Sequence, residues 1–349
     1  MKAMLLKGAG RIEPAELPEP SCPPDGLILQ VKACGLCGGD IRAFNHGNPI
    51  PGGTEIMGHE VTGTVAAVGA DAAGGFKEGE RLALAADIRC DACYYCRQGL
   101  PNLCHNLKIL GKHVAGGFVE YMVLTDEVLR RGIVHRLPEG LDFVQGTLSE
   151  PLSSVLSAHD LLGVGFGQTV VVIGAGPMGC LHAALAKARG AFRVILADRS
   201  RLRLALAEQA LATSGVDCFL NPDETDLEVK VREMTDDLGA DAVIVACPAP
   251  EVPGQAVRLV KRRGTVGVFG GFPPGRDRLE IDGNILHYGE IRLVGNFSYH
   301  PRYHRLSLET LAARVIDPDP FITVYPLTGL AEAIDDASQG KVLKAVLVP

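Results

Sequence analysis

The sequence contains no tryptophan, and aromatic residues make up only 5% of its 349 positions. It therefore gives no indication of an aromatic surface on which a large planar substrate could stack. It also lacks any run of basic residues, and its formal net charge is −7. Because nucleic-acid binding requires concentrated positive charge, we expect no nucleic-acid partner.

Long apolar runs are absent too, so no segment reaches the length that would span a bilayer. The first residues, Met1 to Lys7, carry charge too early and form too short an apolar stretch for a secretory signal. We therefore expect no membrane partner and a cytoplasmic location. The sequence shows no low-complexity segment and no repeat beyond strand–helix alternation, and its length allows two domains with separate cores.

The pattern of strands and turns changes near residue 140. Before it, short strands such as 27–33 and 61–68 alternate with glycine- and proline-rich turns, which predicts an irregular β-rich barrel. After Leu141, strands alternate with helices at the spacing of a parallel, doubly wound sheet, giving an α/β fold class overall. The expected strands are 169–173, 193–197, 218–220, 242–246, 265–269 and 291–295. The expected helices are 201–212, 227–238, 252–262, 302–316 and 329–339, and a last strand, 342–348, is expected to return to the first domain.

A glycine-rich turn follows the apolar strand 169–173 and opens a helix that runs to Arg189. Its glycines suit a dinucleotide-binding turn: one permits the turn, one lets the backbone approach a pyrophosphate, and one allows close helix–strand packing. The next strand ends in Asp198, where a carboxylate can accept hydrogen bonds from a ribose diol. The alternative is an α/β turn with no ligand. The candidate residues of the turn are Gly174, Gly176, Pro177, Met178 and Gly179.

Four of the ten cysteines stand together, at Cys90, Cys93, Cys96 and Cys104. Four thiolates in one loop fit a closed, tetrahedral structural zinc site. An iron–sulfur cluster is the alternative, but the long gap before Cys104 and the missing Cys-Pro sequence favour zinc.

A second set of metal-ligating residue types is spread over the first half, at Cys37, His59, Glu60 and Glu150. Mixed thiolate, imidazole and carboxylate ligands suit a zinc ion that keeps a position open and acts as a Lewis acid. Each residue alone is equally consistent with an ordinary core or surface position. The hypothesis therefore depends on their acting together.

These motifs together resemble the zinc-dependent medium-chain dehydrogenases, and within them the sorbitol and threonine dehydrogenase branch. The segment 58–63 with Gly69 resembles the zinc signature of the family, the four-cysteine loop its structural zinc lobe, and 174–179 its coenzyme fingerprint. The resemblance implies a GroES-like catalytic domain, 1–145, completed by about 297–349, and a Rossmann NAD-binding domain, 146–296. It implies two zinc ions per chain, the catalytic one held by Cys37, His59 and either Glu60 or Glu150.

The resemblance also implies further site residues. Beyond the glycine turn, the coenzyme would be bound by Asp198, Arg199, Arg203, Cys247, Phe269 and Gly270. The substrate would lie near Phe44, Phe297 and Tyr299. Two departures stand out: Ser298 replaces the arginine that commonly precedes this tyrosine in polyol dehydrogenases, and Gly39 replaces the serine or threonine of the proton path.

We therefore expect an NAD-dependent zinc enzyme that oxidises a secondary alcohol of a polyol, cyclitol or sugar derivative. Threonine-type amino-alcohol oxidation is the alternative within the same class. A non-catalytic zinc- and NAD-binding relative is the alternative from another class, although the retained Cys37, His59 and Glu60 argue against it. The family forms dimers and tetramers, so the resemblance implies a homodimer or homotetramer.

Overall fold

The computed structural model describes residues 1–273 and 275–349, which form two compact units. Unit 1 contains Met1–Ser153 and Tyr299–Pro349, and unit 2 contains Ser154–Ser298. The sequence-based division placed the boundaries after residues 145 and 296. No helix within the described ranges has the length and apolar character that crossing a membrane requires.

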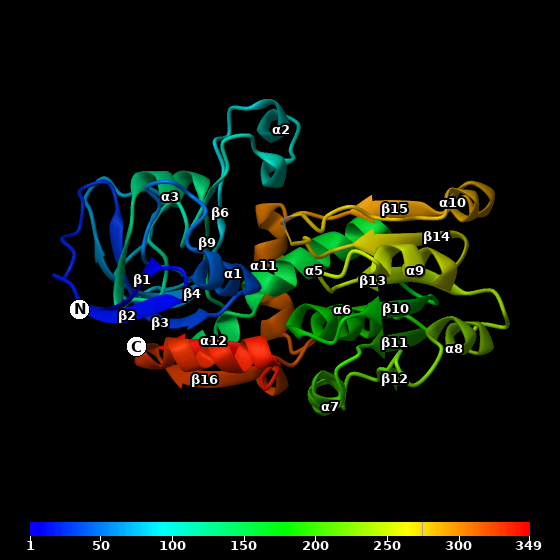
Figure 1. Cartoon of the computed structure of the whole chain (residues 1–349). Helices are drawn as coiled ribbons and strands as arrows, with labels where there is room; N and C mark the ends of the chain where they lie inside the picture. Colours follow the sequence, from blue (N-terminus) through cyan, green and yellow to red (C-terminus); the bar gives the residue numbers. More distant parts are fainter. Residues whose placement is uncertain (274) are drawn as a thin grey trace. The chain divides into compact units, whose positions relative to one another are not determined.

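Unit 1 is built around a seven-stranded sheet that combines strands from the first part of the chain with two strands near its C-terminus (Figure 1). Its order is β16-β17-β3-β4-β5-β9, and β8 pairs with β3. These strands are β3 (Leu27–Gly35), β4 (Glu60–Val68), β5 (Arg81–Ala85), β8 (Tyr121–Leu124), β9 (Ile133–Arg136), β16 (Ile322–Pro326) and β17 (Lys344–Val348). Two small sheets join β1 (Lys2–Gly8) with β2 (Arg11–Glu16) and β6 (Asp87–Ile88) with β7 (Lys108–Ile109).

Short helices fill the connections of unit 1. They are α1 (Gly38–His46), α2 (Tyr94–Arg97), α3 (Asp126–Arg131), α4 (Phe143–Gly146), α11 (Pro301–Ala312) and α12 (Leu330–Gln339). Helix α5 (Ser149–Leu162) begins in this unit, and the 3-10 turns are η1 (Pro101–Leu103), η2 (Asp319–Phe321) and η3 (Leu327–Gly329).

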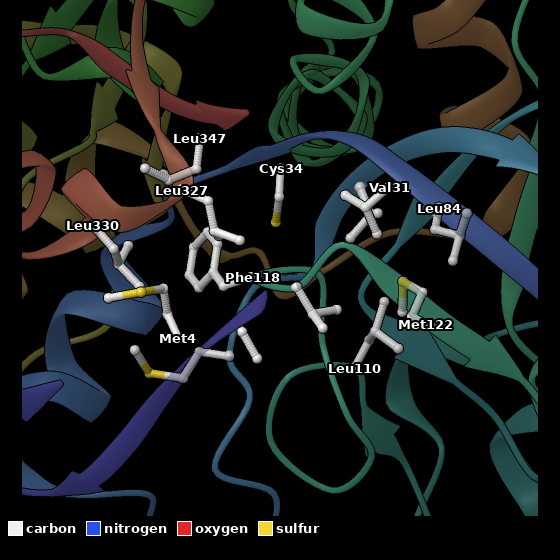
Figure 2. Close-up of a cluster of buried hydrophobic side chains, with 14 of the residues drawn as sticks. Met4, Val31, Cys34, Leu84, Leu110, Phe118, Met122, Leu327, Leu330 and Leu347 are labelled. Atoms are coloured by element: carbon white, nitrogen blue, oxygen red, sulfur yellow. The ribbon is translucent and has the colours of Figure 1, made fainter. Parts of the chain in front are cut away.

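The core of unit 1 draws side chains from distant parts of the sequence. One buried cluster contains Met4 of β1, Cys34 of β3 and Leu347 of β17, together with Phe118 (Figure 2). Leu347 also pairs with Cys34 across the antiparallel β17–β3 ladder, which confirms the expected return of the last strand. Burial of these apolar groups stabilises the unit by roughly 1.5–3 kcal/mol for each large side chain.

Gly58 fixes the backbone at the edge of this core. Its φ is +94°, and a Cβ there would lie 2.6 Å from Cys34 Sγ and 3.2 Å from the Phe118 ring. Only glycine meets both the left-handed conformation and the close approach without strain. The next residue, His59, is thereby held directly before β4.

Unit 2 is a parallel six-stranded sheet of order β12-β11-β10-β13-β14-β15 within the described residues. Its central strands are continuous apolar runs, as expected for parallel strands covered on both faces. The strands are β10 (Thr169–Ile173), β11 (Arg193–Ala197), β12 (Cys218–Leu220), β13 (Ala240–Val245), β14 (Val260–Val268) and β15 (Arg292–Gly295). The helices are α6 (Pro177–Ala188), α7 (Arg201–Ala210), α8 (Leu227–Glu233), α9 (Val252–Leu259) and α10 (Gly283–Gly289). The expected doubly wound architecture is confirmed.

Four helices end earlier than the sequence pattern predicted, and two of them, expected at 201–212 and 302–316, stop at Ala210 and Ala312. The expected helix 252–262 stops at Leu259, and the following residues begin β14, where Lys261 forms an ion pair with Asp241 of β13 at 2.5 Å. The expected helix 227–238 stops at Glu233, because Asp236 and Asp237 take positive φ values of 48° and 64°. In both places local apolar spacing looked helical, whereas strand pairing and turn geometry determine the structure.

Candidate functional site

Cys37, His59 and Glu60 come together at the end of two paired strands. Cys37 follows β3 and forms the N-cap of α1, while Glu60 begins β4 and pairs with Gly35 of β3. The candidate ligand atoms of these three residues all lie within 4.8 Å of one another. The arrangement places one thiolate, one imidazole and one carboxylate around a single point.

Asp40, which the sequence reasoning missed, connects the segments that carry these side chains. Its carboxylate accepts hydrogen bonds from the backbone N–H of Cys37 at 3.0 Å and of Gly58 at 3.3 Å. One carboxylate oxygen also lies 3.7 Å from Nδ1 of His59. At this distance the carboxylate acts on the imidazole through its charge, because 3.7 Å is too long for a hydrogen bond. The signal in the sequence was an acidic residue three positions after the N-cap.

The donor set fits zinc on physical grounds. Within the described residues, Nδ1 of His59 and Oε1 of Glu60 are buried without a hydrogen-bond partner. Burial alone would lower the pKa of His59, but Asp40 and Cys37 raise it well above its usual value. The site therefore favours positive charge at its centre, and a sulfur, nitrogen and oxygen donor set with room for another ligand is typical of catalytic zinc.

Lys344 is a second residue that the sequence reasoning missed. It lies in β17 with 3% of its surface exposed, forms an ion pair with Oε2 of Glu60, and donates a hydrogen bond to the carbonyl of Leu36 at 2.9 Å. Burial opposes its charge, but Glu60 and Cys37 raise its pKa. A single lysine within the apolar stretch 342–348 was the available signal, because buried charges are normally paired.

Glu150 lies in the first turn of α5 and is also buried. Tyr299, which is 2% exposed, donates a hydrogen bond from its hydroxyl to Oε1 of Glu150 at 2.6 Å. Burial raises the pKa of Glu150 to about 7; His59 and the Tyr299 hydrogen bond lower it, whereas Glu60 raises it. Glu150 is thus within electrostatic reach of the three-residue cluster, but it is not part of it.

The start of α5 is held against α11. Ser149 donates its hydroxyl hydrogen to the carbonyl of Gly146, so His304 must donate from Nε2 to the Ser149 oxygen at 3.0 Å. The other ring nitrogen of His304 lies 2.8 Å from Nδ1 of His135 in β9. This chain of hydrogen bonds fixes the residue directly before Glu150.

The four cysteines of the loop 90–104 form a separate cluster. Their sulfur atoms lie within 4.8 Å of one another. The backbone N–H of Cys90 donates a hydrogen bond to the Cys104 sulfur, and that of Cys93 donates one to the Cys90 sulfur, both at 3.3 Å. Backbone N–H groups of Ala92 and Cys93 lower the pKa of Cys90 to about 6, which favours the thiolate form that binds metal. Four sulfur donors with no further ligand type match a structural zinc site.

In unit 2, the glycine turn and the end of β11 form one backbone-lined site. Gly174 has φ +113°, and a Cβ there would lie 2.9 Å from the carbonyl oxygen of Ala246. A Cβ on Gly179 would collide with the Gly174 carbonyl. Asp198 accepts hydrogen bonds from the backbone N–H of Ala175 at 2.7 Å and of Ser200 at 2.8 Å.

Other predicted coenzyme residues take different positions around this turn. Arg203 lies beside it, since a Cβ on Gly176, the N-cap of α6, would be 3.3 Å from its Nη1. Arg199 instead forms an exposed ion pair with Asp223 at 2.9 Å. Pro177 and Met178 form the first turn of α6.

The ends of β13 and β14 provide the remaining predicted coenzyme residues. Cys247 lies next to Gly174 and Gly270: a Cβ on Gly174 would be 3.2 Å from the Cys247 Cβ, and one on Gly270 would be 3.3 Å from its carbonyl oxygen. The rings of Phe269 and His182 of α6 form a T-shaped contact, with ring centroids 4.4 Å apart. These positions share the edge of the sheet at which open α/β folds bind ligands.

The three predicted substrate residues differ in position and in burial. Tyr299 contacts Glu150 inside unit 1, whereas Phe44 is partly buried against the core of that unit. Phe297 belongs to unit 2, and 58% of its surface is exposed. Tyr299 is therefore the predicted substrate residue for which a direct contact with the metal region, through Glu150, is established.

Comparison with known protein families agrees with both units. Residues 23–137 match the family described as "Alcohol dehydrogenase GroES-like domain", and residues 177–313 match "Zinc-binding dehydrogenase". Together the two matches cover the thiolate, imidazole and carboxylate cluster, the four-cysteine loop and the glycine turn from Pro177 onward.

Similar proteins extend over nearly the whole chain. Sorbitol dehydrogenase of Bacillus subtilis is 30% identical, with 100% of this chain and 97% of that protein covered. L-threonine 3-dehydrogenase of Pyrococcus abyssi is 31% identical, with 93% and 89% covered. A solved structure from Sinorhizobium meliloti, assigned as a zinc-binding dehydrogenase and bound to NADP, is 31% identical with a TM-score of 0.86, over 100% and 99% of the two chains. With its two metal-ligating clusters and its dinucleotide-binding fold, the chain therefore belongs to the zinc-containing medium-chain alcohol dehydrogenase family, whose members are zinc- and NAD(P)-dependent oxidoreductases.

Proposed function

We propose that the protein oxidises a secondary alcohol of a polyol, cyclitol or sugar derivative, with NAD as the hydride acceptor. The observation that carries this proposal is a pair of buried carboxylates: Glu60, which lies in the cluster with Cys37 and His59, and Glu150, which is within electrostatic reach of His59. Carboxylates that accept hydrogen bonds suit a substrate with several hydroxyl groups. The similarity to a sorbitol dehydrogenase supports the same substrate class.

In this mechanism Cys37, His59 and Glu60 would hold the catalytic zinc, and Asp40 and Lys344 would keep these side chains oriented. When bound, zinc supplies a Lewis acid that makes a substrate hydroxyl more acidic near neutral pH. Glu150 accepts the hydroxyl proton through one water molecule, because its pKa of about 7 suits a general base at neutral pH. Tyr299 fixes the carboxylate orientation through its 2.6 Å hydrogen bond.

Unit 2 would bind the coenzyme at its glycine turn. Free N–H groups at the start of α6, together with Arg203, are suited to the pyrophosphate. Asp198 is held by two backbone hydrogen bonds and would accept the ribose diol, so its negative charge disfavours the 2′-phosphate of NADP. Arg199 is engaged by Asp223, which leaves less positive charge to offset Asp198. We also propose a cytoplasmic homodimer or homotetramer, which sedimentation analysis would test.

The deciding experiment measures NADH formation by the zinc-loaded protein with polyols, cyclitols, L-threonine and simple secondary alcohols. We expect at least one polyhydroxylated substrate to exceed L-threonine in kcat/KM, and Glu150→Gln to lower kcat on it. Glu139→Gln, an exposed change in the same unit, serves as the control. A clear preference for L-threonine would replace this proposal with amino-alcohol oxidation, and NADH binding without turnover of any alcohol would favour a non-catalytic role.

A further inference from the structure

Arg42 lies on the same face of α1 as Gly38, the first residue of the helix. It follows Gly38 by four positions, and long side chains in a helix lean toward the N-terminus, over the preceding turn. In this helix the preceding turn begins with Gly38 and Gly39, neither of which has a side chain. The guanidinium can therefore fold back toward Cys37, the N-cap residue.

The distances around Gly39 place the guanidinium next to the metal-ligating residues. A Cβ built on Gly39 would lie 3.7 Å from Cys37 Sγ, 3.9 Å from Cε1 of His59 and 3.9 Å from Nη2 of Arg42. A Cβ on Gly38 would lie 3.8 Å from the other terminal nitrogen of Arg42. One point above Gly39 is thus bordered by two metal-ligating side chains and by a cation.

Arg42 has no ion pair or side-chain hydrogen bond in the described part of the chain, and it is exposed to solvent. The neighbouring charges already have partners: Lys344 pairs with Glu60, and Asp40 accepts backbone hydrogen bonds. A planar guanidinium with free donors matches carboxylate and phosphate groups through two parallel hydrogen bonds.

We propose that Arg42 recognises an acidic group of the substrate, a carboxylate or a phosphate, and that Gly39 leaves the room for it beside the hydroxyl to be oxidised. This rests on the proposed function and narrows its substrate class to acidic sugar derivatives: hydroxy acids or phosphorylated polyols. The carboxylates Glu60 and Glu150 would otherwise repel such a substrate. A phosphate of the coenzyme offers the same chemistry, so the experiment must separate the two sources.

The test compares matched pairs of compounds on the zinc-loaded wild-type protein and on Arg42→Gln and Arg42→Lys. The pairs are D-gluconate with D-sorbitol, and sorbitol 6-phosphate with D-sorbitol. We expect an acidic compound to exceed its neutral partner in kcat/KM by about 10-fold or more in the wild type. Arg42→Gln should reduce that ratio by about 10- to 100-fold, mainly through KM, and Arg42→Lys should reduce it less because the charge remains.

Two further measurements keep the inference apart from the proposed function. Fluorescence titration gives the Kd for NADH, and calorimetry gives the binding of the two acidic compounds to the NADH-loaded protein. Equal or better use of neutral D-sorbitol by the wild type would overturn the inference and leave the proposed function intact. A roughly 10-fold weaker NADH Kd in Arg42→Gln with an unchanged acid-to-neutral ratio would also overturn it, in favour of a coenzyme phosphate. If no compound is oxidised, the proposed function falls, and calorimetry still decides whether Arg42 binds acids.

Discussion

Lys344 and Glu60 form an ion pair that is almost completely removed from water, at 3% and 1% exposure. Such a pair adds little net stability, but removing one partner strands the other as a buried charge. The consequence at this site is specific, because Glu60 is also a candidate zinc ligand. A metal ion can therefore neutralise the carboxylate when the lysine is missing.

We predict that Lys344→Met destabilises the zinc-free protein by about 3–5 kcal/mol. Added zinc should restore more stability to the variant than to the wild type, because zinc then supplies the positive charge that Lys344 no longer provides to Glu60. Urea denaturation with and without zinc measures both effects. Lys341→Met, which removes an exposed lysine paired with Asp336, is the control. A metal-free variant as stable as the wild type would contradict the assigned role of Lys344.

Gly39→Ser supplies the hydroxyl that is missing at this position and so tests whether its absence makes room for the substrate. The added Cβ meets its neighbours at ordinary contact distances of 3.7–3.9 Å, so the variant should fold normally. We predict a lower kcat/KM for the natural substrate, because the side chain occupies the space above Gly39, and a higher value for small secondary alcohols. Steady-state kinetics across pH measures both. A gain on every alcohol would mean that the native site only lacks a proton relay.

At the scale of elements, the two metal-ligating clusters should separate folding from catalysis. The four-cysteine loop has little secondary structure of its own, so metal binding there provides folding energy. We predict that Cys96→Ala lowers soluble yield or assembly and removes one zinc ion. Cys37→Ala should remove the other ion and abolish turnover, with the circular dichroism spectrum unchanged. Elemental analysis counts the metal, and equal loss of solubility in both variants would contradict this division.

Asp198, at the end of β11, should determine whether the protein prefers NAD or NADP. We predict that Asp198→Ala lowers the ratio of kcat/KM for NAD to that for NADP by about 10-fold or more, because the carboxylate no longer repels the 2′-phosphate. Arg199→Ala is the matched control from the adjacent position, and it should change the ratio less because Arg199 is paired with Asp223. A wild type that prefers NADP would contradict the role given to Asp198.

The sequence was most informative where one residue type is required by local geometry. Gly174 and Gly179 could be identified because no other residue fits their φ or their contacts, and the cysteine spacing identified the loop 90–104. Asp40, Arg42 and Lys344 could not be placed in the same way, since their roles depend on contacts made by folding. The helix ends at 259 and 233 were misjudged for a related reason: strand pairing and positive φ values override apolar periodicity.

For the whole molecule, acid stability should depend on a buried histidine pair in unit 2. Nε2 of His159 lies 3.0 Å from Nδ1 of His182, and their other ring nitrogens are buried without partners in the described residues. Burial lowers the pKa of His182 to about 3 and, with His182 and Arg189, holds that of His159 well below its usual value. Arg189 itself pairs with Asp160 at 2.7 Å.

Because both folded-state pKa values are below that of free histidine, the unfolded chain binds more protons below about pH 6.5. The contribution of the neutral pair to the free energy of unfolding is therefore fully present above that pH. It is lost as the pH drops toward 3, by about 1.4 kcal/mol per pH unit for each histidine. We predict that His159→Gln combined with His182→Asn flattens this dependence, measured by urea denaturation between pH 7 and 5. His287→Gln, at an exposed position of α10, is the control. An unchanged slope in the double variant would show that the pair is protonated without cost.

The pairing of β17 with β3 also sets an order for synthesis on the ribosome. Unit 2 is one continuous segment, 154–298, whereas the sheet of unit 1 is complete only after residues 344–348 have been synthesised and paired with β3. The coenzyme-binding unit is thus free to fold while the chain is still attached, whereas the ion pair between Lys344 and Glu60 forms last. Nascent chains stalled before β17 should therefore bind NADH while Glu60 still lacks its lysine partner.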